Sequence, residues 1–138
     1  MHLPPLLVER PFGLQVVIAI AVPSLFGLVT GLALSWNEIA YLILAVPIGL
    51  LGGFFAGIEH RGAEEGLLRG VIGGLLFGSC ILYGLEIANA EPKANIGDPQ
   101  AGLVFVTTFF GAIMGALGGR YRLRKERQLE TSGRLVAE

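Results

Sequence analysis

Four long stretches of this chain contain no lysine, arginine, aspartate or glutamate, and this feature limits the folds open to it more than any other. A helix needs about 20 mostly apolar residues to cross a bilayer. Charged residues make up 15% of the chain, whereas soluble domains contain about 25%, so a soluble glycine-rich core would lack polar surface to cover it. The sequence therefore predicts an all-α membrane protein with four transmembrane helices, near residues 12–34, 39–58, 67–88 and 101–120.

Short connections and the distribution of positive charge predict the topology. Because the connections between the predicted helices are short, neighbouring helices should form antiparallel hairpins with both termini on one side. Of the 10 lysines and arginines, only Lys93 lies in a connection on the other side, and positive charge near helix ends favours the cytoplasm. We therefore expect a cell-membrane protein with cytoplasmic termini, comprising an interfacial segment at 1–11, a four-helix domain at 12–120 and a basic cytoplasmic tail at 121–138.

Glycines recur inside the apolar stretches, and the pattern GxxGGxxxG occurs twice, at residues 49–57 and 70–78. Small residues let membrane helices approach closely, because lipid tails are as apolar as leucine and burying leucine between helices gains little. We therefore expect the two repeats to bring the backbones of the second and third helices together. The glycines predicted to mediate helix packing are Gly27, Gly31, Gly49, Gly52, Gly53, Gly57, Gly70, Gly73, Gly74, Gly78, Gly111, Gly115, Gly118 and Gly119.

The double glycines in each repeat present a small surface over a wider arc than one helix contact needs. Each of these helices could therefore contact two neighbours. In one interpretation both neighbours belong to the same chain. In the other, one face packs against a second copy of the chain or against another membrane protein, so that a homo-oligomer or a heteromeric assembly forms.

Two groups of polar residues are candidates for a site. Glu59 and Arg69 flank the charged turn between the second and third helices, where they would form a gate or a proton-linked pair at the inner mouth. Alternatively, this region is a solvated turn with Arg69 snorkelling towards water. Glu86 follows Ser79 and Tyr83 on one helix face, where a carboxylate could bind a cation or proton. Alternatively, Glu86 is simply solvated at the membrane interface. Pro23 and Pro47 lie near the middle of the first two helices, as in transport sites built from broken helices or as ordinary kinks.

The segment after the fourth helix is rich in positive charge. These cations would orient the last helix and contact anionic lipid headgroups, each near-surface cation contributing about 1 kcal/mol. No folded domain surrounds the cluster, so we expect no nucleic-acid partner. The residues assigned to headgroup contact are Arg120, Arg122, Arg124, Lys125 and Arg127.

Function is harder to predict from this pattern than architecture. The sequence contains no hydrolase, kinase or dinucleotide motif and no cluster of metal ligands, so we expect neither an enzyme nor a cofactor. The recurring small-residue seams favour an integral membrane protein that acts by helix–helix association, as a scaffold or small subunit of a membrane assembly. The alternative is a small oligomeric channel, transporter or holin-like pore.

The whole pattern resembles small glycine-rich prokaryotic membrane proteins with four spans and uncharacterised function. The resemblance covers the entire chain and rests on the four apolar stretches and on GxxGGxxxG. It implies a multi-pass membrane protein and carries no implication about substrate or partner.

Overall fold

The structure is a computed structural model that describes residues 3–136, with side chains described up to residue 132. Within those residues all regular secondary structure is helical, which confirms the all-α part of the predicted fold class. The elements in chain order are η1 (Leu7–Glu9), α1 (Phe12–Val16), the π-helical turn η2 (Val17–Ala21), α2 (Val22–Trp36), α3 (Glu38–Ile58), α4 (Ala63–Ile87) and α5 (Gly102–Val136).

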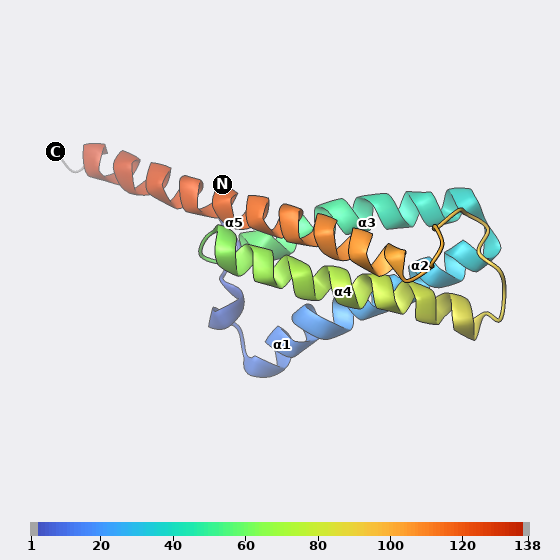
Figure 1. Cartoon of the computed structure of the whole chain (residues 1–138). Coiled ribbons are helices and arrows are strands. Elements are labelled where there is room, and N and C mark those ends of the chain that lie inside the picture. The colour runs from blue at the N-terminus through green and yellow to red at the C-terminus, as the bar shows by residue number, and fades with distance from the viewer. Residues whose placement is uncertain (1–2, 137–138) are drawn as a thin grey trace.

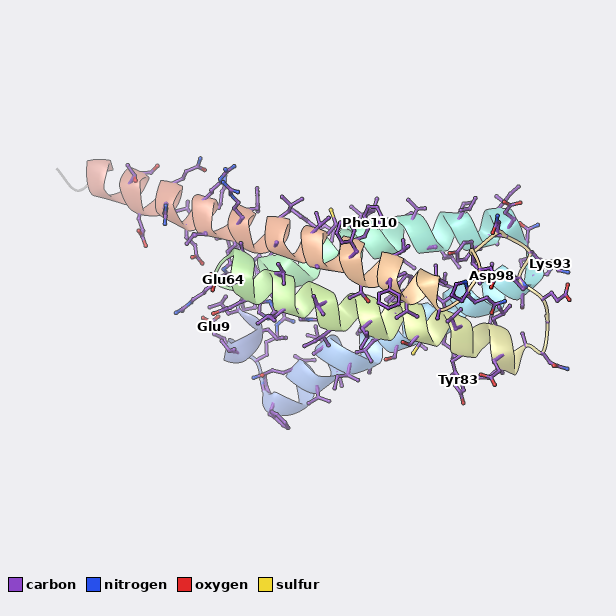
Figure 2. All side chains as sticks on the ribbon, in the orientation of Figure 1. Glu9, Glu64, Tyr83, Lys93, Asp98 and Phe110 are labelled. Carbon is purple, nitrogen blue, oxygen red and sulfur yellow. The ribbon has the colours of Figure 1, made fainter. Side chains whose placement is uncertain are left out.

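Four helical segments are long and apolar enough to cross a membrane. α1, η2 and α2 together form the first of them, so the predicted number of helices of membrane-spanning length is confirmed. Their bounds are Phe12–Trp36, Glu38–Ile58, Ala63–Ile87 and Gly102–Ser132. Figure 2 shows charged residues at both ends of the bundle, with Glu9 and Glu64 at one end and Lys93 and Asp98 at the other.

The last helix extends well beyond its apolar part. α5 continues without a break through the basic segment, and it projects past the other helices at the end of the bundle (Figure 1). Arginine, lysine, glutamate and glutamine are good helix formers, so nothing in this segment stops the helix. Arg122 also pairs with Glu126 one turn later, Nε donating to Oε1 over 2.7 Å, a spacing that stabilises a helix.

The connections account for the antiparallel arrangement. Only Asn37 separates α2 from α3, and its Oδ1 accepts the N–H groups of Ile39 (2.8 Å) and Ala40 (3.1 Å), which caps the start of α3. In the longer connection before α5, Lys93 N–H donates to Leu34 O at the end of α2 over 2.9 Å. Helix ends leave carbonyls without intrahelical donors, and this contact holds the connection over one such end.

The four spans are not packed equally against one another. α4 lies between α2 and α5 and makes its most extensive contacts with α5, whereas α3 packs mainly on α5 and much less on α2 or α4. Tightly packed hydrophobic side chains gather towards the end near Lys93. This core comprises Leu34, Tyr41, Phe77, Ile81, Leu85 and Leu103.

The N-terminal segment is held against the opposite end of the bundle. Leu7 N–H donates to Glu59 O over 3.0 Å, at the end of α3. Arg122 Nη1 donates to Pro4 O over 2.8 Å, and Leu6 and Leu7 are both buried. The segment predicted to lie at the interface therefore has a defined docking position on α3 and α5.

Candidate functional site

Most glycines lie where one helix backbone meets another. A Cβ atom added to Gly70 in α4 would overlap the carbonyl oxygen of Gly111 in α5, and one added to Gly115 would overlap that of Gly66. No side chain other than hydrogen fits at such contacts. The other glycines whose added Cβ would overlap an atom of a neighbouring element are Gly27, Gly31, Gly57, Gly66, Gly74, Gly78, Gly84, Gly111, Gly118 and Gly119.

The two GxxGGxxxG repeats do not contact each other through these glycines, so the expectation of a close backbone contact between the second and third helices is wrong. In both repeats the third and fourth glycines approach α5 instead: Gly53 and Gly57 from α3, and Gly74 and Gly78 from α4. The physical reason is that α5 lies against both helices and provides its own small residues there.

Three of the predicted packing glycines have no neighbouring backbone. An added Cβ would have Phe77 Cε1 as its nearest neighbour at Gly49 (3.9 Å), a side chain of the same helix at Gly52 (4.0 Å), and Arg69 Nη1 at Gly73 (3.1 Å). All three line one cavity. In these positions glycine provides room rather than close helix packing.

This cavity has a volume of about 470 Å³ and is partly open. It lies where α2, α3, α4 and α5 face one another, and both central prolines, Pro23 and Pro47, are in its wall. Exposed apolar residues of α2 and α3 form part of its lining, namely Val22, Phe26, Leu51 and Phe55. The opening therefore lies at the weakly packed boundary between α2 and α3.

Two charged residues, Glu59 and Arg69, line the mainly apolar cavity. Arg69 is only 7% exposed, and its Nη2 donates to Ile18 O over 2.8 Å. That carbonyl lacks a helical donor, because Val22 N–H donates to Val17 O in the π-helical turn and Pro23, the next candidate, has no N–H. The π-helical turn and the proline thus leave an acceptor that the guanidinium group satisfies.

The Arg69 side chain runs along α4 into the bundle. Its Nη1 lies 3.1 Å from the Cβ position of Gly73, which is about 15 Å along the axis from the first residue of α4 at 1.5 Å per residue. The guanidinium group therefore points away from the charged turn, opposite to snorkelling. Its Nε is buried without a hydrogen-bond partner among the described residues.

Glu59 is paired with a residue that sequence reasoning did not assign to the site. Its Oε1 accepts from Arg10 Nη2 in an ion pair, whereas Glu59 and Arg69 were the predicted pair. The second carboxylate oxygen, Oε2, is buried without a donor. Arg10 reaches Glu59 because Leu7 is anchored to the end of α3, and no local sequence signal reveals this contact across 49 positions.

The second predicted group is not brought to a cavity. Ser79 and Glu86 are exposed, and Tyr83 is 58% exposed and points away from the bundle (Figure 2). None of the three lines the cavity described above. Among the described side chains, no three His, Cys, Asp or Glu residues lie close enough to share a metal ion.

Arg122 differs from the other cations of the basic segment. It is 6% exposed, and its Nη1 donates to Ile58 O at the end of α3 over 2.9 Å as well as to Pro4 O. Its guanidinium group thus binds carbonyl groups within the protein instead of lipid headgroups. Headgroup contact stays a prediction for the remaining residues, of which Arg120, Arg124 and Arg127 are exposed and Lys125 is half-buried.

Comparisons with protein-family models, with curated proteins and with solved structures find no match to this chain. The resemblance to small glycine-rich four-span proteins stays a prediction. The basis for a functional assignment is therefore the cavity itself and the Arg10–Glu59–Arg69 cluster beside it.

Proposed function

We propose that this chain is an integral membrane protein that takes a small, mainly apolar molecule from the bilayer into the cavity. It would serve as a binding protein or as the substrate-binding part of a small transporter. The observation that carries the proposal is a partly open cavity of about 470 Å³ with buried, unpaired polar atoms on Glu59 and Arg69. Cavities that bind small molecules typically measure about 300–1,000 Å³ and are apolar with few polar groups.

The glycines that line the cavity indicate that it is a binding site and not merely a region of poor packing. Glycine in a helix interior destabilises by roughly 0.5–1 kcal/mol relative to alanine, and in membrane bundles close contact offsets that cost. Gly49 and Gly52 have no such contact. Their lack of side chains leaves space for another molecule beside α3.

The orientation predicted from the positive charges places the Arg10–Glu59–Arg69 cluster on the cytoplasmic side. With both termini in the cytoplasm of the cell, Glu59 and the start of α4 lie on the cytoplasmic side. The boundary between α2 and α3 then opens towards lipid, because the residues around it are apolar and exposed. A ligand would enter sideways from the bilayer with its polar end near the cytoplasmic half.

The alternative of a scaffold or small subunit stays a prediction with less support. Its main motivation was the recurrence of small-residue seams, and most of those glycines contact other helices of the same chain. They are therefore not free to bind a second copy or another membrane protein. A second copy that covers the opening between α2 and α3 is an outcome that the following experiment can detect.

The test is photo-crosslinking of the full chain in phosphatidylcholine vesicles with a long-chain fatty acid that carries a diazirine near its tail. We expect the label on cavity residues such as Phe77 and Phe55. Gly52→Leu fills the cavity and should reduce labelling at least about tenfold, which corresponds to 1.4 kcal/mol of binding free energy. Gly13→Leu is the matched control, because Gly13 also has open space around it but lies outside the cavity.

Labelling that is equal in the wild type and in Gly52→Leu would contradict the proposal. So would a crosslink from the cavity residues to a second protein chain instead of the probe. That second result would support the scaffold alternative.

A further inference from the structure

We infer that the occupant of the cavity is a single-chain amphiphile with a carboxylate headgroup, and that Arg69 binds that carboxylate. This inference rests on the proposed function and names its substrate class. It starts from Arg69, which is more than nine-tenths buried and lines the cavity, yet has an Nε atom without a partner.

Arg69 has hydrogen-bond donors to spare. A guanidinium group carries five N–H donors, and the structure assigns one of its nitrogens, Nη2, to Ile18 O. The unused donors include Nε–H, which together with a neighbouring Nη–H forms the fork that binds both oxygens of a carboxylate. Buried polar groups are normally hydrogen-bonded, so the free donor indicates a missing acceptor.

The charges around Arg69 select the headgroup. Arg10 and Arg69 each carry one positive charge, and Glu59 carries one negative charge that Arg10 already pairs. The cluster therefore has an excess charge of +1, which one carboxylate neutralises. A phosphate monoester carries about −1.5 to −2 near neutral pH and would leave uncompensated negative charge next to Glu59.

The volume of the cavity selects the tail. Liquid water occupies about 30 Å³ per molecule, and a methylene group is of similar size. A cavity of about 470 Å³ therefore holds on the order of fifteen such groups, which corresponds to one long alkyl chain. Phe26, Ile48 and Phe77 provide the apolar wall along which that chain would lie.

The experiment compares headgroups on one tail. The full chain in phosphatidylcholine vesicles is photo-crosslinked with three diazirine probes of equal chain length: a fatty acid, the corresponding fatty alcohol and an alkyl phosphate. We expect the acid to label cavity residues about tenfold more than the alcohol or the phosphate, a 1.4 kcal/mol preference. Arg69→Gln should remove that preference by lowering acid labelling while leaving alcohol labelling unchanged.

Two further variants separate headgroup binding from folding. Gly73→Ala keeps the arginine but places a methyl group only 3.1 Å from Nη1, so the guanidinium group must shift and the preference for the acid should fall about threefold or more, which is roughly 0.7 kcal/mol. Lys93→Gln removes an exposed cation at the opposite end of the bundle and should behave as the wild type. If Arg69→Gln fails to fold, the wild-type ratio and Gly73→Ala still decide the question.

Equal labelling by the acid and the alcohol in the wild type would overturn the inference and leave the proposed function standing. Stronger labelling by the phosphate would overturn the carboxylate assignment. Labelling of the cavity by none of the probes would overturn the inference together with the proposed function.

Discussion

The contact between α4 and α5 and the cavity beside α3 are built from the same residue type with opposite results. At the α4–α5 contact, glycines let carbonyl groups of the two backbones approach so closely that no Cβ fits. At the cavity, Gly49 and Gly52 face space instead of a backbone. Gly49 and Gly70 even occupy the same position of the repeated motif.

A small-residue motif therefore shows only that a helix surface allows a close approach. Whether another helix packs against the glycines depends on which helix lies opposite them. α5 lies opposite most of the repeat in α4, whereas α3 packs mainly on α5 and little on α2 or α4. The space left beside α3 is the region where a desolvated arginine is tolerated, because Ile18 O satisfies part of it.

The largest expected effect belongs to the α4–α5 contact. Gly70→Ala should destabilise the protein by about 3 kcal/mol, the upper end of the usual overpacking cost of about 1–3 kcal/mol, because the new methyl group would overlap Gly111 O. The measurement is the free energy of unfolding in mixed micelles. A value below about 0.5 kcal/mol would contradict the distinction between the two regions, since it would mean that the two helices separate easily.

A smaller effect is expected at the attachment of α3, which forms one side of the cavity. Arg122→Gln should destabilise by about 2 kcal/mol, because a charged donor to Ile58 O and Pro4 O is lost. Amide hydrogen exchange in residues 3–9 should become faster at the same time. Arg124→Gln, at an exposed cation of the same helix, is the control and should stay within about 0.5 kcal/mol. Unchanged exchange in Arg122→Gln would show that the N-terminal segment is held by other contacts.

A still smaller effect, of opposite sign, is expected at the first glycine of the repeat in α3. Gly49→Ala should stabilise the protein by up to about 1 kcal/mol, because alanine favours a helix over glycine and the new methyl group would be 3.9 Å from Phe77, an ordinary contact. The same unfolding assay applies. Destabilisation similar to that of Gly70→Ala would indicate that Gly49 makes a backbone contact after all.

Helix positions could be predicted from the sequence because apolar length is a local property. The second predicted helix, 39–58, agrees with α3 to within a residue at each end. The third begins four residues earlier than predicted, at Ala63, because Gly62 adopts a positive φ of 113° and starts the helix directly after the turn. The short turn between α2 and α3, at Asn37, was also predicted from the sequence.

The site was only partly predictable. Glu59 and Arg69 were selected because charge next to an apolar helix is locally visible, and both line the cavity. Their partners, Arg10 and Ile18, come from 49 and 51 positions away along the chain, and no periodicity encodes such contacts. Glu86 was selected by the same local reasoning but lies on an exposed face.

Four helices of membrane-spanning length follow from the sequence alone, since about 20 uncharged residues leave the backbone no other partner for its hydrogen bonds in lipid. Which glycines contact a neighbouring helix and which leave room depends instead on how the helices pack. Packing α3 on α5 instead of α4 is a property of the whole bundle. That choice separates Gly49 from Gly70 and leaves Arg69 facing a cavity.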